Sequence, residues 1–176
     1  MVVQHPLVAP TASRLMDGFR QAMRGYVGSV NVLTVEGESG RTGCVATSVS
    51  SFSMTPPCLV FSLAHGSSTA RALRVGRPLG VNLLAPMQQA TAACFAGATG
   101  VTGEHRFEED GWVQAGNGAW VLSTAPCGMA CTVDEVWLRH AHLLVLARVD
   151  AVALRSTAPA VPLMYWSAGY RQADWR

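Results

Sequence analysis

The stretch Gly43-Cys-Val-Ala-Thr-Ser-Val-Ser-Ser-Phe-Ser-Met-Thr-Pro-Pro57 has no charged residue, and it places six serines and threonines between residues 47 and 55. An apolar run at residues 58–63 follows the double proline at once, and a loop of small residues at 64–69 comes next. A core strand does not need so many hydroxyl groups, and a surface loop is seldom followed so closely by a buried strand. We therefore interpret these as two adjacent backbone segments that present hydroxyls and amide N–H groups to a polar, anionic ligand.

The chain around this stretch reads as mainly β. β-Branched or alternating patterns predict strands at 27–35, 42–49, 58–63, 79–84, 120–122, 128–138 and 142–154. Short helices are predicted from Thr11 or Ser13, over 69–75, and from Pro86. We expect the first helix to pack on the strands through an apolar face of Leu15, Phe19, Met23 and Tyr26. Six or seven strands with a few short helices predict a closed, mostly antiparallel β-barrel, as a single domain over 15–176 after a flexible arm at 1–14.

Composition limits the partners. A chain of 176 residues is long enough for one well-packed domain. Only 14% of its residues are charged and 49% are hydrophobic, so apolar surface is left for a homo-oligomer interface. A net charge of +2 argues against nucleic acid or a membrane surface as the partner. All thirteen basic residues are arginine, so any phosphate would be held by arginine, hydroxyl or backbone groups.

Five cysteines occur without a C-x-x-C pair, which favours reduced thiols over disulfides or a zinc site. The N-terminus has no signal-peptide pattern, and no apolar run reaches the length of a membrane span. These features predict a cytoplasmic protein.

The chemistry-bearing residues favour a cofactor enzyme. No paired carboxylates occur in an apolar setting, and the hydrolase, zinc-protease, phosphate-loop and dinucleotide-fingerprint motifs are missing. His140 and His142 share one strand face, but no third ligand accompanies them, so we predict no metal site and favour a single functional histidine near a cleft. A cofactor that brings its own chemistry needs mainly shape, hydrogen bonds and an anion site.

Several residues have two interpretations each. The Ser67-Ser68-Thr69 segment is either a plain helix N-cap or a phosphate site. Thr47 and Ser48 either donate to a heterocycle or add polarity to a hairpin, and Asn82 either joins a structural network or contacts a ligand. Arg106-Phe107 with Trp112 is either a lid or an aromatic anchor.

Taken together, the segments resemble the short-chain flavin reductases, the reductase components of two-component flavin-dependent monooxygenases. The order and spacing of the matching stretches carry the resemblance over roughly residues 15–171. The matching stretches are 19–24, 47–57, 59–63, 67–69, 81–84 with Gln88 or Gln89, 95–96, 106–107 with Trp112, 131–133, His142, 162–163 and 169–170.

The resemblance implies a split β-barrel that binds FMN or FAD, dimerises, and transfers hydride from NADH or NADPH to the flavin. The reduced flavin would then serve a partner monooxygenase or halogenase. Carried over residue by residue, the resemblance implies a nicotinamide-side histidine, His142. It implies flavin contacts at Thr47, Ser48, Val49, Ser62, Leu63, Ala64, Ser67, Ser68, Asn82, Ala96, Gly97 and Tyr170.

The chain departs from the family pattern at two places. Val45 stands where the family often has threonine, and His140-Ala141 replaces the Gly-Asp that precedes the histidine. The second change alters the loop that would meet the nicotinamide nucleotide. This change keeps open the alternative of a non-catalytic flavin-binding protein. A further alternative is an enzyme that resembles pyridoxamine-phosphate oxidase, with tightly held FMN.

Overall fold

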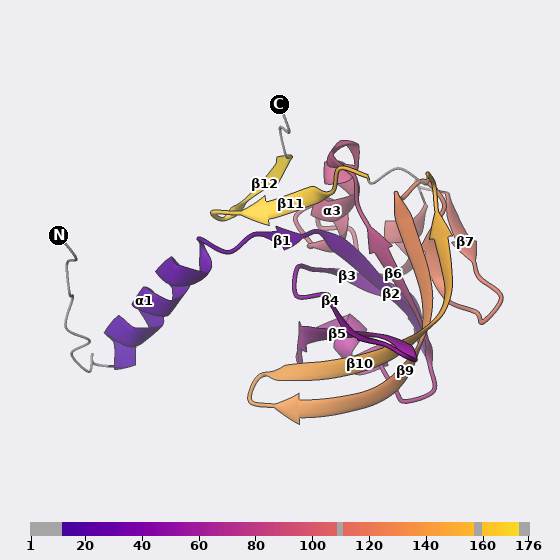
Figure 1. Cartoon of the computed structure of the whole chain (residues 1–176), viewed down its shortest axis with the longest axis horizontal. Coiled ribbons are helices and arrows are strands. Elements are labelled where there is room, and N and C mark those ends of the chain that lie inside the picture. Colours follow the sequence, from indigo (N-terminus) through magenta and orange to yellow (C-terminus); the bar gives the residue numbers. More distant parts are fainter. Residues whose placement is uncertain (1–11, 109–110, 157–159, 173–176) are drawn as a thin grey trace.

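The computed structural model describes residues 12–108, 111–156 and 160–172, and its secondary structure is mainly antiparallel β-sheet (Figure 1). The strands are β1 (Gly28–Ser29), β2 (Asn31–Gly37), β3 (Gly40–Ala46), β4 (Ser50–Met54), β5 (Pro57–Ala64), β6 (Pro78–Leu83), β7 (Trp112–Gln114), β8 (Trp120–Leu122), β9 (Cys127–Arg139), β10 (His142–Leu154), β11 (Leu163–Trp166) and β12 (Gly169–Gln172). The helices are α1 (Ala12–Met23), α2 (Ser68–Ala72) and α3 (Gln89–Phe95), with the 3₁₀ turns η1 (Pro86–Gln88) and η2 (Gly103–Phe107).

Seven strands form the barrel sheet in the order β3-β2-β6-β9-β10-β5-β4. A smaller sheet has the order β1-β11-β12, and β7 pairs with β8. The hairpin of β9 and β10 is the longest pairing, and it projects from one end of the barrel (Figure 1). The mainly β barrel with short flanking helices is as predicted from the sequence.

Strand β2 separates two hydrophobic cores, because successive side chains of a strand point to opposite faces. Leu33 and Val35 lie in the barrel interior, with Phe61, Val81 and Val145. The alternate residues of the same segment, Val30 and Val32, belong to a second core on the other side of the strand. The continuous apolar run of this segment is therefore explained by burial on both faces.

The second core is closed by an aromatic cluster. The ring centroids of Phe95, Phe107 and Trp112 lie 5.0–5.3 Å apart, in edge-on or tilted arrangements that aromatic pairs prefer. Arg106 beside them donates to the carbonyl oxygens of Val101 and Gly43, at 2.9 Å each. Arg106-Phe107 with Trp112 is thus the aromatic anchor of the two alternatives, not a lid.

Helix α1 stands away from the barrel, to which it is joined through β1 (Figure 1). None of its residues is buried, and Phe19 is 63% exposed. The prediction of the helix itself is confirmed, but the expected packing on its own barrel is wrong. An amphipathic stripe shows that a helix face needs a partner, without showing which chain supplies it.

Three strands or hairpins were not predicted from the sequence. Strand β4 forms within the hydroxyl-rich stretch as an edge strand on β5, and β7 and the β11–β12 hairpin lie in segments for which no strand was predicted. The flexible arm was predicted to extend to residue 14, but helix α1 already begins at Ala12. Residues 1–11 of the predicted arm lie outside the described part of the chain. Within the described ranges, no helix is long and apolar enough to cross a membrane.

Candidate functional site

A cleft of about 590 Å³ opens between the end of β3, the C-terminal end of α3 and the β11–β12 hairpin. Three of the residues predicted to bind a flavin line it together: Thr47, Ala96 and Tyr170. Val45, one of the two departures from the family pattern, lines the same cleft. Its volume lies within the range of roughly 300–1,000 Å³ that small-ligand pockets occupy.

Thr47 is placed in this cleft by a close backbone approach. A Cβ atom added at Gly28 would lie 2.8 Å from the carbonyl oxygen and 2.9 Å from the Cβ of Thr47. Any larger residue at 28 would therefore push the Thr47 segment away from β1. Sequence reasoning missed Gly28, because its importance comes from a contact between segments that are distant along the chain.

Ser48 joins the hydroxyl-rich segment to β5. Its hydroxyl accepts from the backbone N–H of Ser62 and donates to the carbonyl oxygen of Ser62, at 3.1 Å in each case. The interpretation as two adjacent backbone segments thus agrees with the structure. The side chain of Val49 beside it packs on the barrel core.

The segment after β5 begins helix α2. The Ser67 hydroxyl accepts from the Ala70 N–H at 3.1 Å, which is the N-cap of the two alternatives. Ser68 is exposed, and its hydroxyl lies 2.8 Å from that of Thr42 on β3. Leu63 is buried in the barrel core, whereas Ala64 at the end of β5 is exposed.

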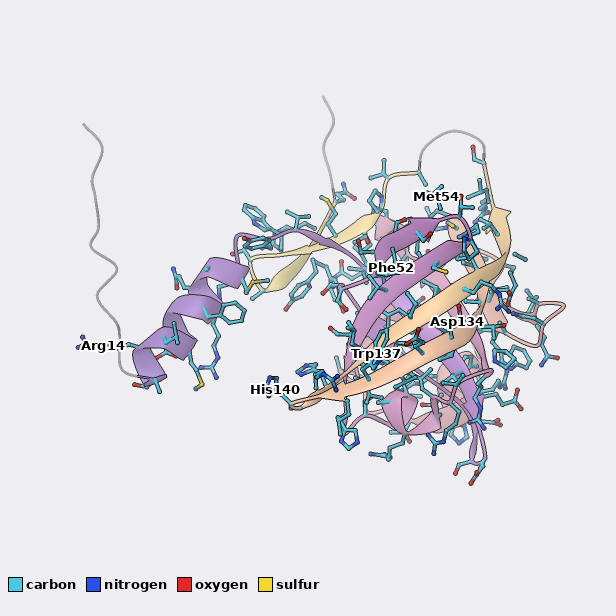
Figure 2. The ribbon with its side chains drawn as sticks, turned by 60° about the horizontal axis from the view of Figure 1, so that its bottom comes forward. Arg14, Phe52, Met54, Asp134, Trp137 and His140 are labelled. Atoms are coloured by element: carbon cyan, nitrogen blue, oxygen red, sulfur yellow. The ribbon has the colours of Figure 1, made fainter. Side chains whose placement is uncertain are left out.

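His142 begins β10 and pairs with Ala64 of β5 and with Arg139 of β9. The turn between the two long strands contains His140 at a positive φ of 50°, and Figure 2 shows His140 at the tip of this hairpin. Both histidines are exposed. The structure brings His142 beside Ala64, but it does not include His142 in the lining of the cleft with Thr47. Among the described residues, no group of three or more histidine, cysteine or acidic side chains could hold a metal ion.

Asn82 lies apart from the cleft. Its side chain is fully buried, its Nδ2 donates to the Val32 carbonyl at 3.1 Å, and its Oδ1 accepts from the Leu122 N–H at 2.7 Å. Both amide atoms thus have backbone partners, and the side chain is shut off from solvent. Of the two interpretations of Asn82, the geometry therefore favours the structural network, which ties β2, β6 and β8 together.

Three titratable groups line the cleft, Cys44, Tyr165 and Tyr170, and burial raises the pKa of Cys44 and of Tyr170. Burial raises the pKa of the Cys44 thiol, against weaker lowering effects of Thr69 and the Arg106 charge. Burial likewise raises the pKa of the Tyr170 phenol, and the neighbouring Tyr165, with ring centroids 5.8 Å apart, adds to the rise. The cleft therefore presents neutral hydroxyl and thiol groups at neutral pH rather than anions.

The arrangement suits an uncharged aromatic ring system with a polar edge. The cleft combines the Thr47 hydroxyl with an aromatic ring at Tyr170 and the apolar side chain of Val45. Gly97, which follows Ala96, has a φ of 83° and would meet nothing within 4 Å if it carried a Cβ, so the backbone there is open to a ligand. A flavin ring fits this set of groups.

Comparison with known proteins agrees with a flavin-binding cleft. The family model described as the flavin reductase like domain matches residues 23–174. The chain belongs to the flavin reductase-like family.

The family assignment agrees with individual relatives. The chain is 32% identical over 136 residues to the 4-hydroxyphenylacetate 3-monooxygenase reductase component of Salmonella typhimurium, covering 77% of this chain and 80% of the relative. It is also 32% identical over 155 residues to an NADH:FMN oxidoreductase of Rhodococcus qingshengii, covering 86% and 79%. The styrene monooxygenase flavin reductase of Pseudomonas putida S12 superposes with a TM-score of 0.77 at 26% identity, covering 90% of this chain and 99% of that one.

Proposed function

We propose that this chain is an NAD(P)H:flavin oxidoreductase, which transfers hydride from NADH or NADPH to FMN or FAD. The observation that carries the proposal is the cleft between Thr47 and Tyr170, in a chain whose flavin reductase match covers residues 23–174. The bound flavin supplies the hydride-accepting chemistry. The residues of the chain bind, orient and shield the reactants.

The hydroxyl-rich segment supplies the polar edge of the site. Ser48 holds residues 47–49 against β5 through its two bonds to Ser62, so the Thr47 hydroxyl and the adjacent backbone N–H groups keep a fixed position. Donors that are already oriented stabilise negative charge that develops on a ligand during reduction. Leu63, Ala64, Ser67 and Ser68 continue this wall toward α2 and are proposed to follow the ribityl chain and phosphate.

His142 is proposed to lie on the nicotinamide side of the site. Its position at the start of β10, next to Ala64, places an exposed imidazole at the end of the wall formed by β5. An imidazole there would orient the nicotinamide ring rather than exchange a proton with it, because hydride transfer needs mainly alignment of the two rings.

The reduced flavin is proposed to serve a monooxygenase or halogenase. Two proteins that this chain resembles are named as reductases of monooxygenase systems, one for 4-hydroxyphenylacetate and one for styrene.

The active form is proposed to be a homodimer. The apolar stripe of α1 faces solvent in the single chain, and Phe52 and Met54 on the edge strand β4 are 63% and 79% exposed (Figure 2). Soluble monomers rarely expose large apolar patches, and a second copy would bury these two surfaces. We also propose a cytoplasmic location, which the five free thiols support.

NADH oxidation in air tests the proposal, measured with no flavin and with added riboflavin, FMN or FAD. We expect turnover that depends on added flavin, and a protein that is colourless after desalting. A yellow protein whose rate of NADH oxidation does not change when flavin is added would instead favour tightly held FMN and the oxidase-like alternative. Flavin binding without oxidation of NADH or NADPH would overturn the enzyme assignment.

A further inference from the structure

A second pocket, of about 440 Å³, lies between the β2–β3 turn, helix α2 and the start of η2. Its lining is unusually basic. The arginines that line it are Arg41, Arg71, Arg74, Arg77 and Arg106. We call it the arginine pocket. Among its described lining residues, Glu38 is the one carboxylate, so arginines outnumber acids five to one.

Two of these arginines are held on the pocket wall by the core. The Arg41 guanidinium lies 4.4 Å from the Trp120 ring centroid and 5.0 Å from that of Phe107, and its Nε is 3.8 Å from a Glu104 carboxylate oxygen. Arg106 is fixed by its bonds to Val101 and Gly43. These two arginines add positive charge to the pocket, while the contacts just described already hold their guanidinium groups in place.

The other three arginines follow one another along α2 and the turn after it. Each donates through Nη1 to a nearby carbonyl: Arg71 to Gly66, Arg74 to Leu73, and Arg77 to Ala72. Each guanidinium has five N–H donors in a planar fork. Hydrogen bonds among the described residues use only one nitrogen of each, so donors suited to a bidentate phosphate contact are left.

The arginine pocket is connected to the flavin cleft by β3 and by the Ser68 hydroxyl. Ser68 lines the pocket and lies 2.8 Å from the Thr42 hydroxyl. Val45 in the cleft is three residues along β3 from Thr42, which is about 10 Å of strand. Because Ser68 itself lines the pocket, a nucleotide with its ring in the cleft and its first phosphate at Ser67 and Ser68 would have that phosphate at the edge of the pocket, and would bring a more distant phosphate among the arginines.

We propose that the arginine pocket binds a second phosphate group of a nucleotide substrate, beyond the flavin phosphate assigned to Ser67 and Ser68. The inference rests on the proposed function. Two substrates offer such a group: FAD, through the phosphate that joins its adenylate half, and NADPH, through its 2′-phosphate. FMN and NADH are the matched ligands that lack it.

The test uses the double variant Arg74→Gln/Arg77→Gln and the control variant Arg155→Gln. Arg155 is exposed at the end of β10 and donates to the Thr124 carbonyl, away from the pocket lining. Dissociation constants are measured for riboflavin, FMN and FAD, and KM values for NADH and NADPH. Circular dichroism and thermal unfolding show whether the variants are folded.

We expect the double variant to raise the dissociation constant of FAD, or the KM of NADPH, by tenfold or more. The value for the matched ligand, FMN or NADH, should stay within twofold of the wild type. A loss for FAD but not FMN identifies the flavin dinucleotide as the source, and a loss for NADPH but not NADH identifies the nicotinamide nucleotide. Equal losses for FMN and FAD, with riboflavin unchanged, would contradict the inference, because the pocket would then hold the first flavin phosphate. Unchanged selectivity in both pairs would also overturn it.

Failure of the proposed function would be seen separately. Riboflavin, FMN and NADH all lack the additional phosphate of FAD or NADPH, so a wild-type protein that reduces neither flavin with NADH would count against the reductase activity alone. The binding constants for FMN and FAD would still decide the role of the arginine pocket.

Discussion

Ser48 shows how one hydroxyl group can fix two backbone segments relative to each other. Its two bonds to the backbone of Ser62 join the hydroxyl-rich segment to the strand that leads toward Ala64 and His142. A hydroxyl that accepts and donates to one residue fixes the relative position of two backbones. The same residue therefore sets where Thr47 and the neighbouring N–H groups stand.

Replacing Ser48 with alanine should weaken flavin binding by about three- to tenfold, the value of one ordinary hydrogen bond. Fluorescence quenching of FMN or FAD measures the change. Ser50→Ala, on the exposed face of the adjacent β4, is the matched control and should bind flavin like the wild type. Equal affinities for all three proteins would show that the Ser48–Ser62 link does not order the site.

His142→Ala should slow hydride transfer by roughly tenfold or more, since alignment of the reacting rings is lost. Flavin affinity should change much less, because His142 lies outside the lining of the Thr47 cleft. Rapid mixing of NADH with the protein–flavin complex measures the rate as the flavin colour disappears. His140→Asn, at the tip of the same hairpin, serves as the control, and identical rates in wild type and His142→Ala would sink the assignment.

Cys131 is expected to make the folded state less stable as the pH becomes alkaline. Burial, and then the negative charge of Asp150 and of Cys127 and Cys58 when ionised, raises the pKa of its thiol to about 12 in the folded chain. In the unfolded chain a cysteine ionises near pH 8.5 or so. The folded state binds the proton more tightly, so this stabilisation is complete below about pH 8.5 and declines as the pH rises toward about 12.

Urea unfolding at about pH 7 and about pH 10 should therefore show a larger loss of stability for the wild type than for Cys131→Ala. The variant should be less stable at neutral pH by about 1–2 kcal/mol, because it leaves a small cavity. If wild type and variant lose stability in parallel, Cys131 does not keep its proton in the folded state.

Residue identities allowed prediction of the hydroxyl-rich wall, but not of how it is held. Thr47, Ala96 and Tyr170 do line one cleft, although they are far apart along the chain. The position of Thr47 requires glycine at 28, because the two backbones lie close together although they are distant along the chain. No local sequence pattern encodes such a contact. Asn82 was visible as an unusual polar residue in an apolar strand, yet only the structure shows that both its amide atoms are occupied by backbone partners.

Among elements, long or strongly patterned segments were predicted well and short ones were not. Strand β10 matches its predicted bounds, and β9 differs by one residue at each end. Strands β4, β11 and β12 have four or five residues each and little apolar alternation. Their pairing with β5 and with each other comes from neighbours, so propensity alone could not reveal them.

Helix α1 presents its apolar face to solvent, and we expect that face to contact a second copy. The double substitution Phe19→Asp/Met23→Asp should convert the proposed dimer to a monomer, while the melting temperature of the monomeric barrel changes little because no α1 residue is buried in its own chain. Sedimentation equilibrium measures the mass. Arg14→Glu on the same helix is the control (Figure 2). A variant that keeps the wild-type dimer mass would exclude α1 from the interface.

At the scale of the whole molecule, composition and order of motifs predicted more than any single motif. Low charge density, the hydroxyl-rich stretch and the absence of acid–base motifs pointed to a cofactor-binding barrel, and the barrel is what the chain forms. The two cores on either side of β2 then explain how one sheet both closes the barrel and supports the cleft. The basic pocket beside α2 was invisible in the sequence, because its arginines come from three separate segments.

The central claim is that this chain transfers hydride from a nicotinamide nucleotide to a flavin, and the most direct measurement is made without oxygen. The purified protein is mixed with FMN or FAD and a stoichiometric amount of NADH or NADPH, and the flavin absorbance is followed. We predict rapid bleaching that requires the protein and ends when the nicotinamide is consumed. Flavin that binds, as judged by quenched fluorescence, but keeps its colour with both donors would contradict the account.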